Sequence, residues 1–160
     1  MKILLKVVKW LAIVVACLVV VVQFIRPART NPPVDESQTI FARTHMTPEV
    51  SAILERSCRD CHSNKTVWPW YTNVAPISWF IADHVNGGRH MMNLSEWGRL
   101  ERDRQGKKLT QMCDEVTDGA MPLSTYTPLH PGSKLSPDEV NTLCAWTSAE
   151  KQLLDSVSPK

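Results

Sequence analysis

The chain has 160 residues, a length typical of one domain with an additional terminal segment, and 18 basic against 16 acidic residues give it a formal net charge of +2. The excess of basic residues lies at the N-terminus, because residues 1–29 contain five basic residues and no acidic one. Residues 30–160 therefore hold 13 basic and 16 acidic residues, a formal charge of −3, which argues against nucleic acid as a partner.

Residues 1–25 are predicted to be an N-terminal membrane anchor or signal. Only Gln23 interrupts the apolar run from position 10 to position 25. As a helix, residues 3–25 would reach roughly 34 Å, enough to cross a hydrocarbon layer of roughly 30 Å if the lysines at positions 6 and 9 extend to its surface. No small-residue cleavage site follows, so we expect an uncleaved anchor. A cleaved signal, or a lipoprotein attached through Cys17, is the alternative.

The charges around this segment predict its orientation. Three lysines precede the apolar run and two arginines follow it, so the positive-inside rule favours, with a reduced margin, an N-terminus in the cytoplasm. The rest of the chain would then lie in the periplasm, as in a single-pass protein of the bacterial inner membrane. Four cysteines beyond Cys17 are compatible with this oxidising compartment.

Residues 26–46 are rich in Arg, Pro and polar residues without an apolar period, and we interpret them as a spacer. Helix signals dominate residues 47–155. Thr47-Pro48 predicts the start of a short helix that leads to Cys58, and Ser136-Pro137-Asp138-Glu139 predicts the start of the last helix. Further helices are expected over 77–85, 96–104 and 107–118, the first ending at Gly87-Gly88 and the third at Gly119. The fold class is therefore mostly α, with long loops.

The run Cys58-Arg59-Asp60-Cys61-His62 is the attachment pattern of c-type haem. Each thiol can add to one haem vinyl group to form a thioether, and two intervening residues let both sulfurs reach one edge of the ring. The histidine that follows can give its imidazole to the iron. We therefore expect one covalent haem c per chain, held by Cys58 and Cys61, with His62 as the proximal ligand.

Three other uses of the same cysteines are alternatives. A thioredoxin-like dithiol would lie in a βαβ context, and the sequence shows no such pattern. A zinc site would need two further ligands besides Cys58 and Cys61. The two cysteines could also form a plain structural disulfide.

Met121 is the predicted sixth ligand of the iron. It lies in Gly119-Ala120-Met121-Pro122, just past a predicted helix end, where glycine permits the turn and proline stiffens the loop. His84 and His130 are the alternatives, and a site without a sixth ligand is another. His/Met ligation raises the reduction potential and blocks the position that a small ligand or peroxide would use.

Aromatic residues crowd the sequence after His62. We expect some of them to cover the haem: Trp68, Trp70, Tyr71, Trp79 and Trp97. Arg89 is a candidate partner for a haem propionate. Cys113 and Cys144 both lie on apolar helix faces, and a disulfide between them would tie the helix before Met121 to the C-terminal helix.

Beyond the motif, a series of residues forms a recognisable pattern: Cys58-x-x-Cys61-His62-Ser63-Asn64, Trp68-Pro69-Trp70-Tyr71, Ala75-Pro76, Trp79, His84-Val85, Gly88-Arg89, Asn93-x-Ser95-x-Trp97, Met121-Pro122-Leu123, Tyr126, His130-Pro131 and Trp146. Over residues 48–147 this pattern resembles the small bacterial haem-binding domain family, whose members carry one CxxCH, are typically exported or membrane-anchored and are related to cytochrome c. The resemblance implies a cytochrome c-like helical domain with haem on Cys58 and Cys61. It includes both the Met-Pro element and the later histidine, so it does not select the sixth ligand.

These observations favour a membrane-anchored monohaem c-type cytochrome that relays single electrons in the periplasm, with no residue acting in acid–base catalysis. Its redox partner proteins are not identified by the sequence. The rival hypothesis is a haem-based sensor or peroxidase-like protein with an open distal site, where a small-molecule ligand could bind and His84 or His130 could assist peroxide cleavage.

Overall fold

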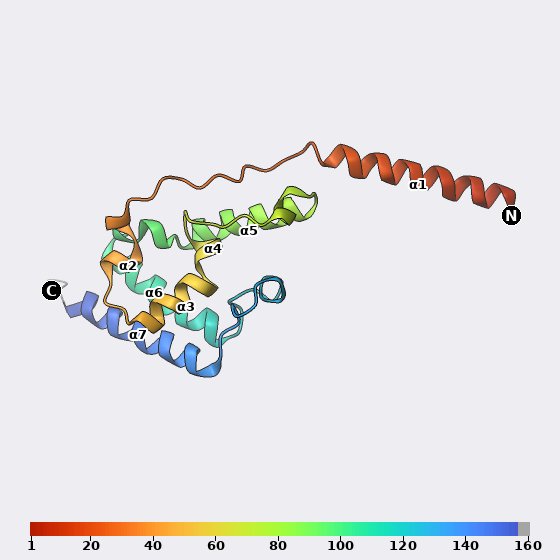
Figure 1. Ribbon diagram of the computed structural model, residues 1–160. Helices are drawn as coiled ribbons and strands as arrows, with labels where there is room; N and C mark the ends of the chain where they lie inside the picture. The colour runs from red at the N-terminus through yellow and green to blue at the C-terminus, as the bar shows by residue number, and fades with distance from the viewer. Residues whose placement is uncertain (157–160) are drawn as a thin grey trace.

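The computed structural model describes residues 1–156, and these form helices joined by loops, with no strand among them (Figure 1). The α-helices are α1 (Lys2–Val22), α2 (Ile40–Arg43), α3 (Pro48–Ser57), α4 (Arg59–His62), α5 (Ile77–Met91), α6 (Arg102–Thr117) and α7 (Pro137–Ser156). Four 3₁₀ turns lie between them: η1 (Glu36–Gln38), η2 (Trp70–Asn73), η3 (Leu94–Arg99) and η4 (Thr127–Leu129). The predicted fold class, mostly helical behind one apolar N-terminal helix, is confirmed.

Helix α1 extends away from the rest of the molecule (Figure 1). It has 21 residues, none of them buried, and a mean hydropathy of 2.6 over its most apolar window. It is long and apolar enough to cross a membrane, although a signal sequence has the same properties. The helix ends at Val22 and the chain then turns at Gln23 and Phe24.

The segment interpreted as a spacer has two parts. Residues 25–35 are extended without regular structure and run along the domain (Figure 1). The second part folds onto the domain: Thr39 caps α2 by accepting a hydrogen bond from the Ala42 backbone, and Ile40 is completely buried in the core. A single apolar residue at this position carries no periodic signal, so the sequence alone did not indicate the contact.

The core lies between α3, α6 and α7. Its fully buried side chains include Ile53 and Leu54 of α3, Leu109 of α6 and Leu143 of α7. The caps predicted at two helix starts are confirmed. Thr47 accepts a hydrogen bond from the Val50 backbone at the start of α3. Ser136 and Glu139 exchange reciprocal hydrogen bonds at the start of α7, the arrangement of a capping box.

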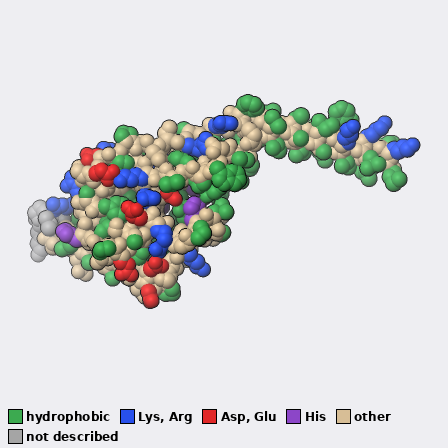
Figure 2. Space-filling view, viewed as in Figure 1, with side chains coloured by type: hydrophobic (Ala, Val, Ile, Leu, Met, Phe, Trp, Pro, Cys, Tyr) green, Lys and Arg blue, Asp and Glu red, His purple; other side chains and the backbone are tan. Residues whose placement is uncertain are grey.

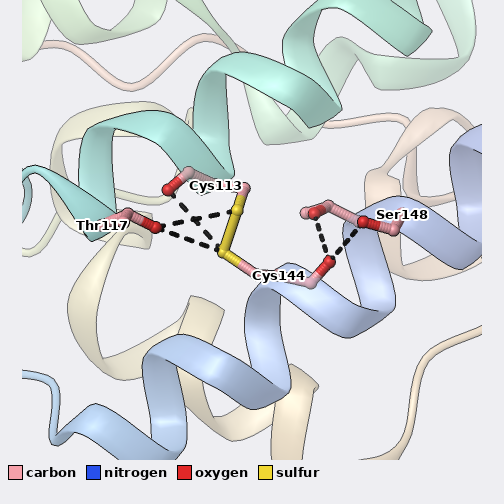
Figure 3. The surroundings of a disulfide bond; sticks show 5 residues. Cys113, Thr117, Cys144 and Ser148 are labelled. Atoms are coloured by element: carbon pink, nitrogen blue, oxygen red, sulfur yellow. Dashed lines mark hydrogen bonds between the residues drawn. A yellow bond between two sulfur atoms is a disulfide. The ribbon is translucent and has the colours of Figure 1, made fainter.

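Helices α6 and α7 are joined by the predicted disulfide between Cys113 and Cys144 (Figure 3). The hydroxyl of Thr117, one turn beyond Cys113, lies 3.6 Å from the Cys144 sulfur and 3.8 Å from the Cys113 sulfur. The bridge therefore fastens the last turn of α6, immediately before the loop that carries Met121, to the C-terminal helix.

Two helix predictions are wrong, and the helix expected over 107–118 begins earlier, at Arg102. Helix α5 does not end at Gly87-Gly88 but continues to Met91. A glycine inside a helix is tolerated where close packing requires it, and a Cβ atom at Gly88 would lie 2.6 Å from the Cys61 carbonyl oxygen. Gly88 thus lets α5 approach α4 closely.

The helix expected over 96–104 is also absent. Residues 94–99 form the 3₁₀ turn η3, which is capped by the Asn93 side chain rather than by Ser95, and α6 begins only at Arg102. Burial of Leu94 and Trp97 in the core fixes this turn. Tertiary packing here overrides the local helix signal.

Candidate functional site

The CxxCH motif lies on one wall of a cavity of about 380 Å³, within the range of small-molecule and cofactor sites. Helix α3 delivers the chain to Cys58, and the single turn of α4 then carries Cys61 and His62 to the cavity. The other walls are a face of α5, a face of α6 and the loop that follows α6. These elements come from distant parts of the sequence, and the lining is mostly apolar.

His62 is oriented by its neighbour. Its Nδ1 atom lies 3.0 Å from the Met92 carbonyl oxygen, which can only accept, so Nδ1 carries the proton of the neutral ring. Burial lowers the pKa of His62, which also favours the neutral imidazole. The remaining lone pair is therefore on Nε2, as in metal-binding histidines held by a backbone carbonyl.

The two motif cysteines are free thiols in an apolar environment. Burial raises the pKa of Cys58 to about 12 and that of Cys61 to about 11. A thioredoxin-like dithiol would lie in a βαβ context, whereas residues 1–156 contain no strand, so these thiols do not have the setting of that class. Within residues 1–156, no group of three or more His, Cys, Asp and Glu side chains is placed to hold a metal ion.

Met121 lines the same cavity as His62. Helix α6 ends at Thr117, and Gly119 adopts a positive φ of 70°, which confirms the expected stop. The Met121 backbone then donates a hydrogen bond to the Glu115 carbonyl oxygen at 3.0 Å. This bond folds the loop back on α6 and fixes the start of the Met121 side chain beside the cavity.

Of the two alternative histidines, the structure brings only His84 to the cavity. Its Nδ1 atom lies 2.7 Å from the Phe80 carbonyl oxygen, so Nε2 is the nitrogen left for a ligand, as in His62. His130 is not among the residues that line the cavity. Its Nδ1 contacts the Tyr126 carbonyl oxygen at 2.9 Å and its Nε2 the Tyr71 hydroxyl at 3.3 Å.

Tyr126 is a residue of the cavity to which the sequence analysis gave no role. Its hydroxyl donates a hydrogen bond of 2.9 Å to Asp60, one of the two residues between the motif cysteines, and its ring stacks on His130. Burial, and secondarily the Asp60 carboxylate, raises the pKa of Tyr126, so the hydroxyl stays a donor. The bond ties the Met121 loop to the CxxCH turn.

The aromatic residues do not cover the cavity as expected. The five residues named for that role are absent from its lining: Trp68, Trp70, Tyr71, Trp79 and Trp97. Trp97 is in the core, 1% exposed, whereas Trp70 is 78% exposed. Aromatic content alone could not distinguish a cofactor cover from a core residue or an outward-facing one.

Arg89 does not face the cavity either. Its guanidinium donates hydrogen bonds to Ser63 and Thr66 of the loop after the motif, and to Thr30 and Asn31 of the extended segment. Arg89 therefore joins the N-terminal segment to the domain. The cation that lines the cavity is Lys108 of α6, which the sequence analysis did not single out, because one lysine in a charged helix gives no signal.

The residues present fit a haem. Two unpaired thiols and a neutral imidazole share one wall, and a thioether lies on another. A Cβ atom at Gly87 would meet nothing within 4 Å, so the glycine leaves room beside the cavity. The roles of Cys58, Cys61, His62 and Met121 as haem ligands stay predictions.

A comparison with protein families matches residues 17–149 of the chain to the family described as haem-binding domain. This match covers most of the chain and includes every residue that lines the cavity. No match to the chain was found among the curated proteins or among the solved structures.

Proposed function

Because the chain belongs to the haem-binding domain family, we propose that it is a membrane-anchored monohaem c-type cytochrome that relays single electrons in the bacterial periplasm. One observation carries this proposal: the free thiols of Cys58 and Cys61 and the Nε2 atom of His62 lie together at one apolar cavity. Bound haem would supply the one-electron chemistry, since its iron cycles between the ferric and ferrous states.

The chain's own residues supply attachment and orientation. Cys58 and Cys61 would form the two thioethers, and the Met92 carbonyl oxygen keeps the proton of His62 on Nδ1, which leaves Nε2 for the iron. Lys108 at the cavity carries a positive charge that can pair with a propionate carboxylate. Gly88 keeps α5 against Cys61, so that the α5 wall of the cavity is held in place.

Met121 is the sixth ligand in this proposal. Its loop is held on both sides: by the Met121 backbone hydrogen bond to Glu115, and by the Tyr126 hydroxyl on Asp60. A ligand loop fixed in this way would change little between oxidation states, which favours electron transfer over ligand binding. With His62 and Met121 both holding the iron, no residue would need an acid–base role.

A second candidate function follows from His84. This residue lines the cavity with Nε2 free for a ligand, so it could replace Met121 at the iron or, if the sixth position is open, stand beside a bound peroxide or gas. The protein would then be a sensor or peroxidase-like. His130, whose two ring nitrogens contact tyrosines, is less suited to this role.

The test is the visible absorption spectrum of the full chain, produced in a host with cytochrome c maturation, in ferric and dithionite-reduced forms. We expect low-spin bands, the weak long-wavelength ferric band of sulfur ligation, and haem that remains on the chain after denaturation. Loss of haem on denaturation would overturn covalent attachment. A high-spin ferric spectrum that shifts with cyanide would favour the second candidate.

Met121→Ala and His84→Ala distinguish the ligands. We expect Met121→Ala to remove the long-wavelength band and lower the reduction potential, because His/Met ligation gives the higher potential, whereas His84→Ala leaves both unchanged. The reverse result would make His84 the sixth ligand. Both variants need spectra and potentials measured on the same preparation.

A further inference from the structure

Hydrophobic side chains are exposed on η2, at the residue that follows it and on the first turn of α5. Trp70 is 78% exposed, Val74 41%, Ile77 45% and Phe80 49%. We call these four residues the apolar patch. Single exposed hydrophobic residues are common, but an aromatic-rich group over eleven consecutive positions marks a surface that contacts something apolar.

The apolar patch lies beside the base of α1. The Gln23 side chain, just after the last helical residue, donates to the Ala75 carbonyl oxygen at 3.2 Å and accepts from the Ala75 backbone at 2.9 Å. The Trp79 indole donates to the Ile25 carbonyl oxygen at 2.7 Å. Both partners lie among the patch residues in sequence, so the base of α1 is fastened to the patch from two sides.

The extended segment after Ile25 adds a third connection between the base of α1 and the domain. The Arg29 guanidinium donates to the Thr72 carbonyl oxygen at 2.8 Å and to the Asn73 side chain at 2.6 Å. These two residues belong to η2, between Trp70 and Val74. Figure 1 shows this end of the domain nearest α1, and Figure 2 shows hydrophobic side chains gathered there.

The length of α1 then determines the depth of the apolar patch relative to the bilayer. Its 21 residues reach roughly 32 Å, about the thickness of the hydrocarbon layer. Gln23 would therefore stand at the boundary between hydrocarbon and headgroups, and Ala75, bonded to it, stands there too. Arg26 follows at the depth of the lipid phosphates, where a cation is favoured.

We propose that the apolar patch inserts into the headgroup interface of the outer leaflet. The domain would then lie on the bilayer surface instead of moving freely on the spacer. The inference builds on the membrane anchoring in the proposed function. Trp and Phe are the residues that prefer this interface, because a ring can bury its apolar area at the headgroup level. A lipid surface matches the patch in chemistry and in position.

The insertion would also orient the cavity. Phe80 of the apolar patch contacts His84, with ring centroids 4.1 Å apart, and His84 lines the cavity. One turn of α5 thus separates the bilayer surface from a cavity wall. The haem site would be held close to the membrane, and its redox partner would be reached at that surface.

The experiment uses the full haem-loaded chain in vesicles of phosphatidylethanolamine and phosphatidylglycerol that contain a phospholipid with a photoreactive diazirine at the top of its acyl chain. After illumination, labelled peptides are identified by mass spectrometry. We expect labels on α1 and on peptides with residues 70–80. The double variant Trp70→Glu/Phe80→Glu should keep the label on α1 and lose it on residues 70–80, with the haem spectrum unchanged.

Leu153 provides the control, since it is 48% exposed and belongs to α7, a helix that Figure 1 shows away from α1. Its peptide should stay unlabelled, and Leu153→Glu should leave the labels on residues 70–80 as they are. Label on α1 but not on residues 70–80 would overturn insertion alone and would favour a protein partner for the patch. Label on neither would overturn the anchoring as well.

Discussion

The two halves of α5 have different surroundings. Its second half, with His84, Gly87, Gly88 and Met91, lines the cavity beside the CxxCH turn. Its first turn, with Ile77 and Phe80, is exposed beside the base of α1. One helix thus connects the candidate site to the end of the domain nearest α1.

The difference teaches that hydrophobicity alone does not locate a cofactor. The residues of the second half that line the cavity include two glycines and one imidazole, and their value to the site comes from close approach to Cys61 and from an oriented ring nitrogen. The exposed half holds bulkier apolar groups but no group that could hold a haem. The two halves of α5 are therefore distinguished by the placement of their polar atoms and not by their hydrophobicity.

The largest effect should come from Cys58→Ala/Cys61→Ala. Without the thiols no thioether can form, so we expect complete loss of the haem that remains on the chain after denaturation. The measurement is the haem absorbance of the denatured, purified chain. Trp70→Ala/Phe80→Ala, in the apolar patch, is the matched pair and should retain full covalent haem. Loss of haem in both pairs would mean that the exposed half also shapes the site.

The next effect concerns the support of the cavity wall from α6. Cys113→Ala/Cys144→Ala removes a bridge between positions 31 residues apart, which in the chain-entropy treatment lowers the free energy of unfolding by about 3–4 kcal/mol. Denaturant unfolding followed by circular dichroism measures it. Cys17→Ala, at an exposed position of α1, should change nothing. A loss below about 1 kcal/mol would show that packing of α6 on α7 suffices without the bridge.

Gly88→Ala tests the close approach in the cavity half of α5. The added methyl group would lie 2.6 Å from the Cys61 carbonyl oxygen, so α5 must shift, and we expect a cost of about 1–3 kcal/mol with a lower yield of haem-loaded protein. Gly106→Ala is the control, because its methyl group would meet only Lys151 at 3.9 Å. That substitution should stabilise α6 by about 0.5–1 kcal/mol. Equal effects at both glycines would refute the steric account.

Much of the fold could be predicted because its signals are local. Thr47 and the Ser136–Glu139 pair cap helices through their own neighbours in sequence, and the apolar stretch of α1 is visible in composition. Gly88 misled the prediction because its role depends on Cys61, a residue 27 positions away. A glycine that ends a helix and one that admits a neighbouring helix look the same in sequence.

The features of the site also fall into those with a local sequence signal and those that depend on tertiary contacts. The CxxCH motif is local, and His62 meets its cavity as the motif requires, but the carbonyl oxygen that orients it belongs to Met92. His84 and His130 could not be separated by sequence, since only tertiary contacts turn His130 toward Tyr71. The aromatic residues follow His62 closely in sequence, but they do not line the cavity. Distance along the chain does not determine distance in space.

The smallest expected effect is at the other end of α5. Trp79→Phe keeps most of the ring but removes the indole donor that holds the Ile25 carbonyl oxygen, so the free energy of unfolding should fall by only about 0.5–1.5 kcal/mol. The informative readout is local: amide hydrogen exchange should accelerate over residues 23–29, at the base of α1, and stay unchanged over residues 84–91. Faster exchange over 84–91 as well would mean that the two halves of α5 open together. The cavity would then depend on the domain's attachment to α1, because loss of the hydrogen bond at the base of α1 would affect His84 through one continuous helix.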